Sequence, residues 1–349
     1  MTRKPATMRD VAQRAGVSPA TVSNVLGQRK PVDPALAERV RRAAAELDYA
    51  VDRAASQLRS GKAQVVAILV PSLENPFFTA LIAAVERSLS RDGYDIIVAS
   101  SGDDAATERK RLAALLSWRP AGVVVVPTTD NFASRDPLDG ARVPYVTVDR
   151  VADDPDLDAV TVDNAAAARV AAGHLLELGH RQLLVVASSL ALANIRERCD
   201  GARAAWRAAG LAEPAVLEVG LSFDEIAERI DAHLERCGRP TAVLALTNFA
   251  TLGVIAAFGR RDIAIPADVS LVGFDDYRWM AVATPSITAV AQPVERMGAA
   301  AWERLRARIA GGGDAPSRLK LACRLEIRQS TRAVGPPLPT IGAAEKEWA

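Results

Sequence analysis

Cysteine is scarce in this chain of 349 residues, which contains three, together with three histidines. These residues are Cys199, Cys237, Cys323, His174, His180 and His233. The cysteines lie far apart and form no C-x-x-C pair, so they predict neither a disulfide framework nor a thiolate metal site. The histidines have no metal-ligand spacing relative to them. We therefore expect no metal and no cofactor, and a chain that resides in a reducing compartment.

Long apolar runs are also missing, although 49% of the residues are hydrophobic. No run reaches the roughly 18 apolar residues that a membrane-spanning helix needs. The first residues, Met1–Thr7, lead into a polar amphipathic segment without the apolar core of a signal peptide. The sequence therefore predicts a cytoplasmic protein that has no membrane partner.

The sequence motifs of several enzyme classes are absent. There is no G-x-S-x-G, no G-x-x-x-x-G-K-[ST] and no G-x-G-x-x-G after a predicted strand. The run Gly311–Gly313 is predicted to be a loop after a helix, and not a phosphate cradle. Asp149 and Asp275 could form an acid/base pair, but no nucleophile or metal ligand stands near them in the sequence. We expect no catalytic residues and no enzymatic activity.

Charge is distributed unevenly, although the net charge is only +1. Residues 1–62 contain twelve Lys/Arg and six Asp/Glu, a local charge of +6, and the remaining residues contain 31 and 36, a charge of −5. A basic head on an acidic body indicates that the head binds a polyanion such as DNA. The alternative, an ordinary solvated surface, is not excluded by charge alone.

Two short helices are predicted near the start of the chain. Thr7 to Asp10 have the form of a capping box, and Gly16 ends the helix that follows. Ser18 offers an N-cap to the next helix, with Pro19 at its first position, where a missing N–H costs nothing. This second helix contains small polar residues and no acidic residue, as a helix that approaches phosphates requires.

A third helix is predicted to begin at Asp33 and Pro34, another pair of cap and proline. Its expected apolar face consists of Leu36, Val40, Ala44 and Leu47. Two short helices joined by a turn that contains glycine, with a third helix as support, form a helix-turn-helix unit. The alternative is a small helical bundle without a role in nucleic-acid binding.

From Gln64 onward the pattern alternates between strands and helices. The expected strands are Val65–Val70, Asp95–Ala99, Val123–Val126, Tyr145–Val148, Leu183–Ala187, Ala242–Leu246 and Ser270–Phe274. The expected helices between them are Phe77–Arg91, Thr107–Trp118, Ala165–Leu178, Cys199–Ala209, Phe223–Arg236 and Phe249–Arg260. Such alternation predicts parallel sheets covered by helices on both faces. The number of strand candidates favours two sheets over one.

A series of motifs along nearly the whole chain resembles the lactose/galactose-repressor (LacI/GalR) family of transcription regulators. The motifs are Thr7–Ala12, Ala15–Leu26, Tyr49, Ala54–Arg59, Asn75–Phe78, Val148–Arg150, Val162–Asn164, Gly179–Arg181, Asp268–Asp276 and Thr284–Thr288. Each motif alone is weak evidence, but their order over the chain is specific.

The resemblance implies an α/β protein with a helix-turn-helix head, a hinge helix and a two-lobed core like that of periplasmic binding proteins, built on two parallel sheets. The implied divisions are a head (1–50), a hinge (51–63), a core (64–335) and a flexible tail (336–349). Lobe 1 comprises about 64–163 and 293–323, and lobe 2 about 164–291 and 324–335. The chain is expected to cross between the lobes near Asn164, Gln292 and Arg324.

At the DNA end, the resemblance implies a homodimer that binds a palindromic operator in double-stranded DNA. The implied contact residues are Thr7, Ser18, Pro19, Ala20, Thr21, Ser23, Asn24, Tyr49, Arg53, Ala55, Leu58 and Arg59. Pro19, Ala20 and Asn24 occupy the positions that choose bases, and Asn24 can make a bidentate contact to adenine. Many family members have Arg in place of Asn24, so the operator sequence is left open. Leu58 is expected to wedge between central base pairs, or else to pack against the core.

At the other end, the resemblance implies a small polar effector bound between the lobes, with a sugar as the first candidate and a sugar acid, nucleoside or other metabolite as alternatives. The implied contact residues are Phe77, Phe78, Asp149, Arg198, Asn248 and Asp275. Thr247 and Asn248 replace a common Asn-Asp pair, which favours a ligand with fewer donors or with negative charge. Trp279 and Met280 are candidates for the dimer surface or for the lobe core.

Two other classes of protein fit the sequence less well. A sugar-binding module of a transporter would share the two lobes, but it would need a signal peptide and would not need the basic head. An α/β enzyme would need catalytic motifs that the chain lacks. Whether the effector releases DNA or promotes its binding is left open.

Overall fold

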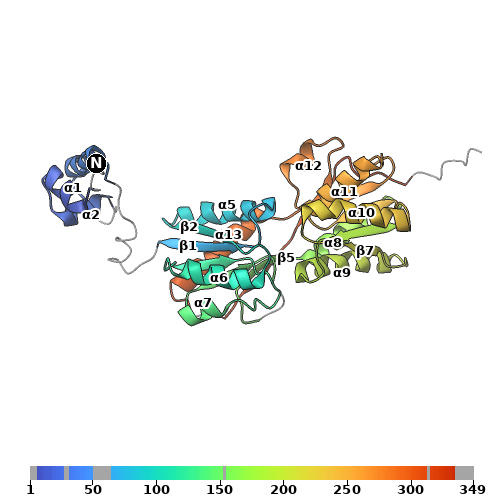
Figure 1. Ribbon diagram of the computed structural model, residues 1–349, viewed down its shortest axis with the longest axis horizontal. Helices are drawn as coiled ribbons and strands as arrows, with labels where there is room; N and C mark the ends of the chain where they lie inside the picture. The colour runs from blue at the N-terminus through green and yellow to red at the C-terminus, as the bar shows by residue number, and fades with distance from the viewer. Residues whose placement is uncertain (1–5, 27–30, 50–63, 152–154, 313–314, 335–349) are drawn as a thin grey trace, which may run out of the picture. The chain divides into compact units, whose positions relative to one another are not determined.

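The computed structural model describes residues 6–26, 31–49, 64–151, 155–312 and 315–334. The chain divides into two compact units, Met1–Ala63 and Gln64–Ala349 (Figure 1). Two predicted segments lie outside the described residues: the hinge over 51–63, with Arg53, Ala55, Leu58 and Arg59, and the tail over 336–349.

The described part of the N-terminal unit contains α1 (Met8–Ala15), α2 (Pro19–Leu26) and α3 (Pro34–Glu46). The predicted capping box is confirmed: Thr7 Oγ1 accepts from the Asp10 N–H at 3.4 Å, and the Thr7 N–H donates to Asp10 Oδ2 at 2.7 Å. Gly16 ends α1 with φ 65°, in the left-handed region that favours glycine. The Ser18 hydroxyl caps α2 by accepting from the Thr21 N–H at 3.1 Å.

The buried face of α3 differs from the predicted one. Asp33 caps the helix as expected, because its Oδ1 accepts from the N–H groups of Ala35 and Leu36. The fully buried residues are Ala37, Val40, Ala43 and Ala44, whereas Leu36 and Leu47 are only half-buried. Small alanine side chains let α3 approach α1 and α2 closely, and Leu47 packs at the margin of this small core.

The second unit contains two six-stranded sheets, with strand orders β11-β5-β4-β3-β1-β2 (sheet A) and β12-β10-β9-β8-β6-β7 (sheet B). Sheet A consists of β1 (Val65–Val70), β2 (Asp95–Ser100), β3 (Gly122–Val125), β4 (Tyr145–Val148), β5 (Ala159–Val162) and β11 (Arg318–Leu321). Sheet B consists of β6 (Leu183–Ala187), β7 (Ala215–Glu218), β8 (Ala242–Ala245), β9 (Ser270–Phe274), β10 (Thr288–Ala291) and β12 (Arg324–Glu326). The predicted α/β fold with two sheets is confirmed.

Helices cover both faces of sheet A, which forms lobe 1. They are α5 (Pro76–Ser90), α6 (Ala105–Leu116), α7 (Asp136–Ala141) and α13 (Val294–Ile309). Ile68 and Val70 of β1 pack with α5 and α13, whereas Ala67 and Leu69 pack with α6 and α7 on the opposite face (Figure 1). Because strand side chains alternate between faces, a strand buried on both sides is a continuous apolar run, and this is why β1 was predictable.

Sheet B forms lobe 2 in the same way. Its helices are α8 (Asn164–Glu177), α9 (Ala193–Ala208), α10 (Phe223–Cys237), α11 (Asn248–Arg260) and α12 (Arg278–Val282). One core contains residues of α8 and α9, and the other contains residues of α10 and α11. Leu184 and Val186 of β6 enter the second core, whereas Val185 enters the first.

Within the described residues, the chain passes between the sheets three times: after β5, after β10 and between β11 and β12. The last passage adds one exception to the predicted parallel sheets, because β12 pairs antiparallel with β10. The carboxyl edges of both sheets line one cavity between the lobes. A strand that leaves sheet A at this edge therefore enters sheet B from its carboxyl edge and must run against the strands there.

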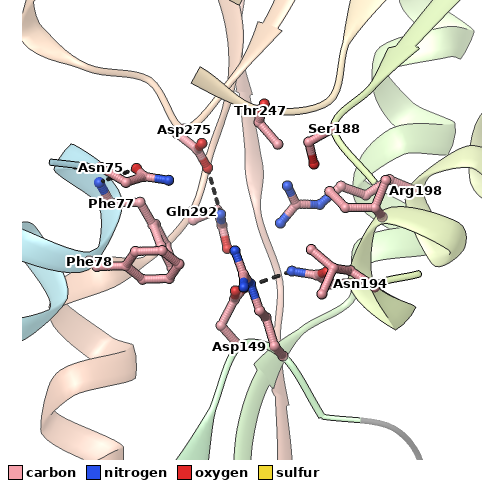
Figure 2. Close-up of a pocket in the computed structure, with 13 residues that line it drawn as sticks. Asn75, Phe77, Phe78, Asp149, Ser188, Asn194, Arg198, Thr247, Asp275 and Gln292 are labelled. Atoms are coloured by element: carbon pink, nitrogen blue, oxygen red, sulfur yellow. Dashed lines mark hydrogen bonds between the residues drawn. The ribbon is translucent and has the colours of Figure 1, made fainter. Parts of the chain in front are cut away.

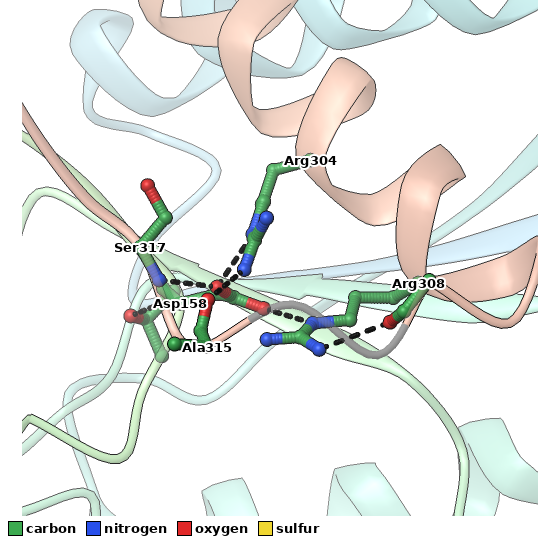
Figure 3. Close-up of polar contacts among 7 residues, drawn as sticks. Asp158, Arg304, Arg308, Ala315 and Ser317 are labelled. Atoms are coloured by element: carbon green, nitrogen blue, oxygen red, sulfur yellow. Dashed lines mark hydrogen bonds and ion pairs between the residues drawn. The ribbon is translucent and has the colours of Figure 1, made fainter.

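A buried carboxylate ties the returning chain to lobe 1 (Figure 3). Asp158, just before β5, accepts from Arg304 Nε and Arg308 Nε of α13, each at 2.6 Å, and from the Ser317 N–H at 2.8 Å. Burial by itself would raise the pKa of Asp158, but the bonds from Arg308, Ser317 and Arg304 outweigh it and hold this pKa below its ordinary value. The cluster fixes α13 and β11, which come late in the chain, onto the earlier strands.

In the part of the chain that the structure describes, no helix is both long enough and apolar enough to cross a membrane. The same residues contain no group of three or more His, Cys, Asp or Glu side chains arranged to hold a metal ion.

Candidate functional site

The second helix of the N-terminal unit presents the predicted DNA-reading residues at its start. Ser18, Pro19 and Ala20 are exposed, and Thr21 and Asn24 are half-buried, as is Ser23. Val22 and Val25 point into the small core and fix the orientation of the helix. The exposed start of α2 contains no acidic side chain, so its free N–H groups and small hydroxyls can approach phosphates without repulsion.

Contacts from α3 hold α1 beside this helix. Arg39 donates to the Ala15 carbonyl oxygen at 2.6 Å, at the end of α1, and Arg14 pairs with Glu46 at 2.6 Å. Tyr49 packs against the same core, and Thr7 is engaged in its capping box at the surface. The head is therefore a rigid support for the exposed end of α2.

A second candidate site is the cavity between the two lobes of the second unit (Figure 2). It encloses about 40 Å³ and is lined by Asn75, Phe77, Phe78, Asp149, Arg150, Ser188, Leu192, Asn194, Ile195, Arg198, Thr247, Asp275 and Gln292. A larger adjoining pocket of about 360 Å³ shares five of these residues, Asn75, Phe78, Arg150, Ser188 and Thr247. The two pockets are therefore neighbours that share part of their lining.

The carboxyl ends of strands from both sheets supply the polar lining. Asp149 directly follows β4, Asp275 follows β9, and Gln292 follows β10. Ligands of open α/β sheets bind at such edges because backbone and side-chain groups converge there. Both aspartates have positive φ values, 67° and 80°, so the chain turns sharply at each strand end.

Arg198 reaches the cavity from α9 in lobe 2. Its Nε donates to Asn164 Oδ1 at 2.8 Å, its Nη1 donates to the Leu246 carbonyl oxygen at 2.7 Å, and its guanidinium lies 3.9 Å from the centroid of the Phe274 ring. These contacts fix the plane of the guanidinium. Among the described residues, none accepts a hydrogen bond from Nη2, which is therefore available to a ligand.

Three buried oxygens at this cavity have no hydrogen-bond partner among the described residues: Asp149 Oδ1, Asn194 Oδ1 and Gln292 Oε1. The other polar atom of each side chain is engaged. Asn194 Nδ2 donates to Asp149 Oδ2 at 3.1 Å, and Gln292 Nε2 donates to Asp275 Oδ1 at 2.6 Å. Because a buried acceptor without a partner costs free energy, these oxygens favour a ligand that donates several hydrogen bonds.

Burial affects the ionisation of Asp275. It raises the pKa of this carboxyl, although Arg198 and the bonds from Gln292 and the Asn248 N–H act in the opposite direction. A ligand that donates to the carboxylate would stabilise its ionised form.

Aromatic rings form the lobe 1 side of the cavity. Phe77 and Phe78, at the start of α5, are buried and meet edge to face, with 5.4 Å between ring centroids. The Arg150 guanidinium lies 5.3 Å from the centroid of the Phe78 ring and pairs with Asp103. One apolar wall beside several acceptors suits a molecule with an apolar face and a polar edge.

The structure brings five of the six predicted effector residues to this cavity: Phe77, Phe78, Asp149, Arg198 and Asp275. Asn248 does not line it; its side-chain oxygen accepts from Trp279 Nε1 at 3.2 Å, and its neighbour Thr247 is the lining residue. Met280 is buried in the lobe 2 core, and Trp279 packs against that core, which favours the core alternative for both residues.

Sequence reasoning did not single out Arg150, Asn194 or Gln292 as effector residues. Arg150 lies in a motif that was recognised, directly after Asp149, so the motif itself contained the signal. Asn194 lies in the first turn of α9, which begins at Ala193 and not at the predicted Cys199. Gln292 follows β10, a strand that was not among the expected ones.

Comparison with known proteins gives matches to both units. Residues 7–52 match the family described as bacterial regulatory proteins, lacI family, and residues 172–331 match the periplasmic binding protein-like domain. The chain is 33% identical to the HTH-type transcriptional regulator PtxS of Pseudomonas putida, over 95% of this chain and 97% of that protein.

Two solved structures are similar over most of the chain. One is the lac repressor dimer bound to operator and the anti-inducer ONPF, with 26% identity and a TM-score of 0.83 over 95% of this chain and all of that one. The other is a complex of the transcriptional regulator CelR with cellobiose, with 29% identity and a TM-score of 0.69 over 93% of this chain and 99% of that one.

Proposed function

Because the chain belongs to the lacI family of bacterial regulatory proteins, it is a DNA-binding regulator of transcription, and we propose that it represses genes under the control of a hydroxyl-rich effector bound between its lobes. We also propose that the protein acts in the cytoplasm and has no catalytic role. It also includes the predicted division into head, hinge, two lobes and tail.

At the DNA end, the proposal assigns α2 to the major groove. Pro19, Ala20 and Asn24 would contact bases, and Thr7, Ser18, Thr21, Ser23 and Tyr49 would hold the backbone. Support comes from the exposure of the start of α2 and from the basic charge of the head. One head offers a small interface, so a homodimer that reads a palindrome supplies the affinity. The lac repressor, which is similar over nearly the whole chain, is a dimer in its complex with operator.

At the effector end, the observation that carries the proposal is the set of three unpartnered acceptors, Asp149 Oδ1, Asn194 Oδ1 and Gln292 Oε1, in one cavity. Adjacent hydroxyl groups of a sugar can donate to all three, while Arg198 Nη2 donates to a ring or hydroxyl oxygen. The Phe77 and Phe78 wall would contact the C–H face of the sugar. Cellobiose in the CelR complex is a sugar bound by a similar protein.

The DNA part of the proposal is tested by titrating palindromic fragments, selected from the genome by the purified protein, against bulk competitor DNA at fixed salt. We expect a preference of at least about a thousandfold for the selected fragment. Asn24→Ala should reduce this preference, whereas Gln13→Ala, which removes an exposed side chain of α1, should leave it unchanged. A protein that prefers no fragment would contradict the proposal.

The effector part is tested by repeating the titration with neutral sugars, sugar acids and nucleosides. We expect a neutral sugar to change operator affinity by about 5- to 150-fold, which is the usual range of coupling between two sites. The direction of the change shows whether the effector releases DNA or promotes its binding. A response to nucleosides alone would replace the sugar with another ligand class.

A further inference from the structure

The loop after β3 in lobe 1 reaches the first turn of α9 in lobe 2. Asp130 Oδ1 accepts from the Ala193 N–H at 2.7 Å, and Asp130 Oδ2 accepts from Arg196 Nη2 at 2.5 Å. Asp130 follows a strand of sheet A, and α9 follows β6 of sheet B. One carboxylate thus makes two hydrogen bonds from one lobe to the other.

Helix α9 has no N-cap side chain of its own. Its N-cap residue is Leu192, whose side chain cannot accept a hydrogen bond. The first N–H groups of a helix need acceptors, and negative charge is favourable at this end. Asp130 supplies both from the opposite lobe. The Leu190 carbonyl oxygen also accepts from Arg196 Nη1 at 2.8 Å, so the arginine that pairs with Asp130 is itself held in place.

The loop that carries Asp130 is fixed within lobe 1. The buried Glu108 of α6 accepts from the N–H and the hydroxyl of Thr128, each at 2.7 Å, and from the hydroxyl of Ser134. Phe132, in the same loop, is fully buried. The carboxylate of Asp130 is therefore presented by a rigid support, as a positioning residue requires.

Three residues of the effector cavity, Asn194, Ile195 and Arg198, lie on the first turns of α9. We propose that Asp130 is a positioning residue for effector binding: it caps α9 across the lobes and thereby sets where these side chains meet the lobe 1 half of the cavity. The inference deepens the proposed function and rests on it, because it concerns closure of the same cavity. Asp130 itself is not among the lining residues, so it acts through α9.

The test is hydrogen exchange of the full-length protein without DNA or effector. Asp130→Asn, in lobe 1, should speed exchange of the amides at 193–196 in lobe 2 by about tenfold. Arg196→Gln, in lobe 2, should speed exchange in the loop at 128–134 of lobe 1. The double variant should show no more than the larger single effect, because both changes remove the same contact.

Matched controls are Asp136→Asn and Arg229→Gln, whose ion pairs with Arg109 and Glu225 lie within one lobe each. They should leave both segments unchanged. If each residue had a purely local role, each variant would change exchange rates in its own lobe only, or the rate changes of the two variants would multiply in the double variant. Either result would overturn the proposal. Since the measurement uses neither DNA nor effector, its failure would leave the proposed regulation of transcription standing.

Discussion

Asp149 and Asp275 are counterparts in the two lobes: each directly follows the strand that is third in the spatial order of its sheet, β4 or β9. Each has a positive φ and lines the same cavity. Their partners differ. Asp149 Oδ1 has none among the described residues, whereas both oxygens of Asp275 accept hydrogen bonds. Asp149 therefore offers a ligand a free acceptor oxygen, whereas the carboxylate of Asp275 is already held in place by its own hydrogen bonds.

Asp275→Asn should change the stability of the effector-free protein in a way that depends on pH, because it removes a buried charge but also replaces one of the two acceptors used by the Asn248 N–H and by Gln292 with a donor. Burial raises the pKa of Asp275, so the folded state favours the protonated carboxyl. The stability that this group contributes is present below the ordinary carboxyl pKa of about 3.9 and is lost as pH rises through the raised value. Denaturant titrations from pH 8 downward should show the stability of the variant decreasing relative to the wild type as pH falls through the raised pKa of Asp275. A stability difference between variant and wild type that does not change with pH would contradict this explanation.

Arg198→Lys should weaken effector binding by about tenfold to a hundredfold, because a single ammonium nitrogen lacks the planar fork whose separate nitrogens bind Asn164, Leu246 and a ligand. Calorimetric titration with the effector identified from the panel measures the loss. Arg203→Lys, five residues further along α9 and paired with Asp200, is the matched control and should bind normally. Equal losses in both variants would point to damage to α9 and not to a ligand contact.

Asp158→Asn should lower the free energy of unfolding at pH 7 by about 2 kcal/mol, because Arg304 and Arg308 would lose their charged partner at a side chain that is only 4% exposed. The bonds from both arginines hold the pKa of Asp158 below its ordinary value. Its stabilising effect is therefore present above about pH 3.9 and is lost as pH falls through the lower, folded-state value.

Urea titrations at several pH values measure this difference between variant and wild type. Asp200→Asn, which breaks an exposed ion pair, should change stability by less than about 0.5 kcal/mol. A variant of Asp158 that is as stable as the wild type at pH 7 would show that the cluster is not needed to hold α13.

Leu58→Ala should weaken specific operator binding by more than about tenfold while the effector-binding unit stays folded. The basis is the resemblance of the Ala54–Arg59 segment to a hinge whose leucine wedges into the minor groove, since Leu58 lies outside the described residues. Salt-matched titrations on the specific fragment and on bulk DNA separate the two kinds of binding. Unchanged specific affinity would remove the wedge.

Seven of the twelve described strands were predicted, among them the edge strand β2, whereas the buried strands β5 and β10 were missed together with the edge strands β7, β11 and β12. The predicted bounds of β1, β4, β6 and β9 agree with the structure because these strands are covered on both faces and consist of apolar runs. The strands β7, β11 and β12 lie at the edges of their sheets and are largely exposed, so their side chains show no such run. Their pairing depends on residues distant in sequence.

The site was predictable where a residue directly follows a predicted strand. Asp149 and Asp275 satisfy this condition, and the resemblance supplied Arg198. The contact between Asp130 and Arg196 depends on how the two lobes close on one another, and no local pattern in the sequence contains that information. The same reason explains why Asn194 was missed, since its partner Asp149 lies in the other lobe.

The three passages of the chain between the sheets have an evolutionary consequence. Neither lobe is one continuous stretch of sequence, and the cavity lining is distributed from Asn75 to Gln292. A recombination event that exchanges a short segment between two relatives would join halves from different parents at Asp149 and Asn194. A cassette spanning Asn75 to Gln292 contains the whole lining, so an exchange of that length would transfer a ligand preference intact.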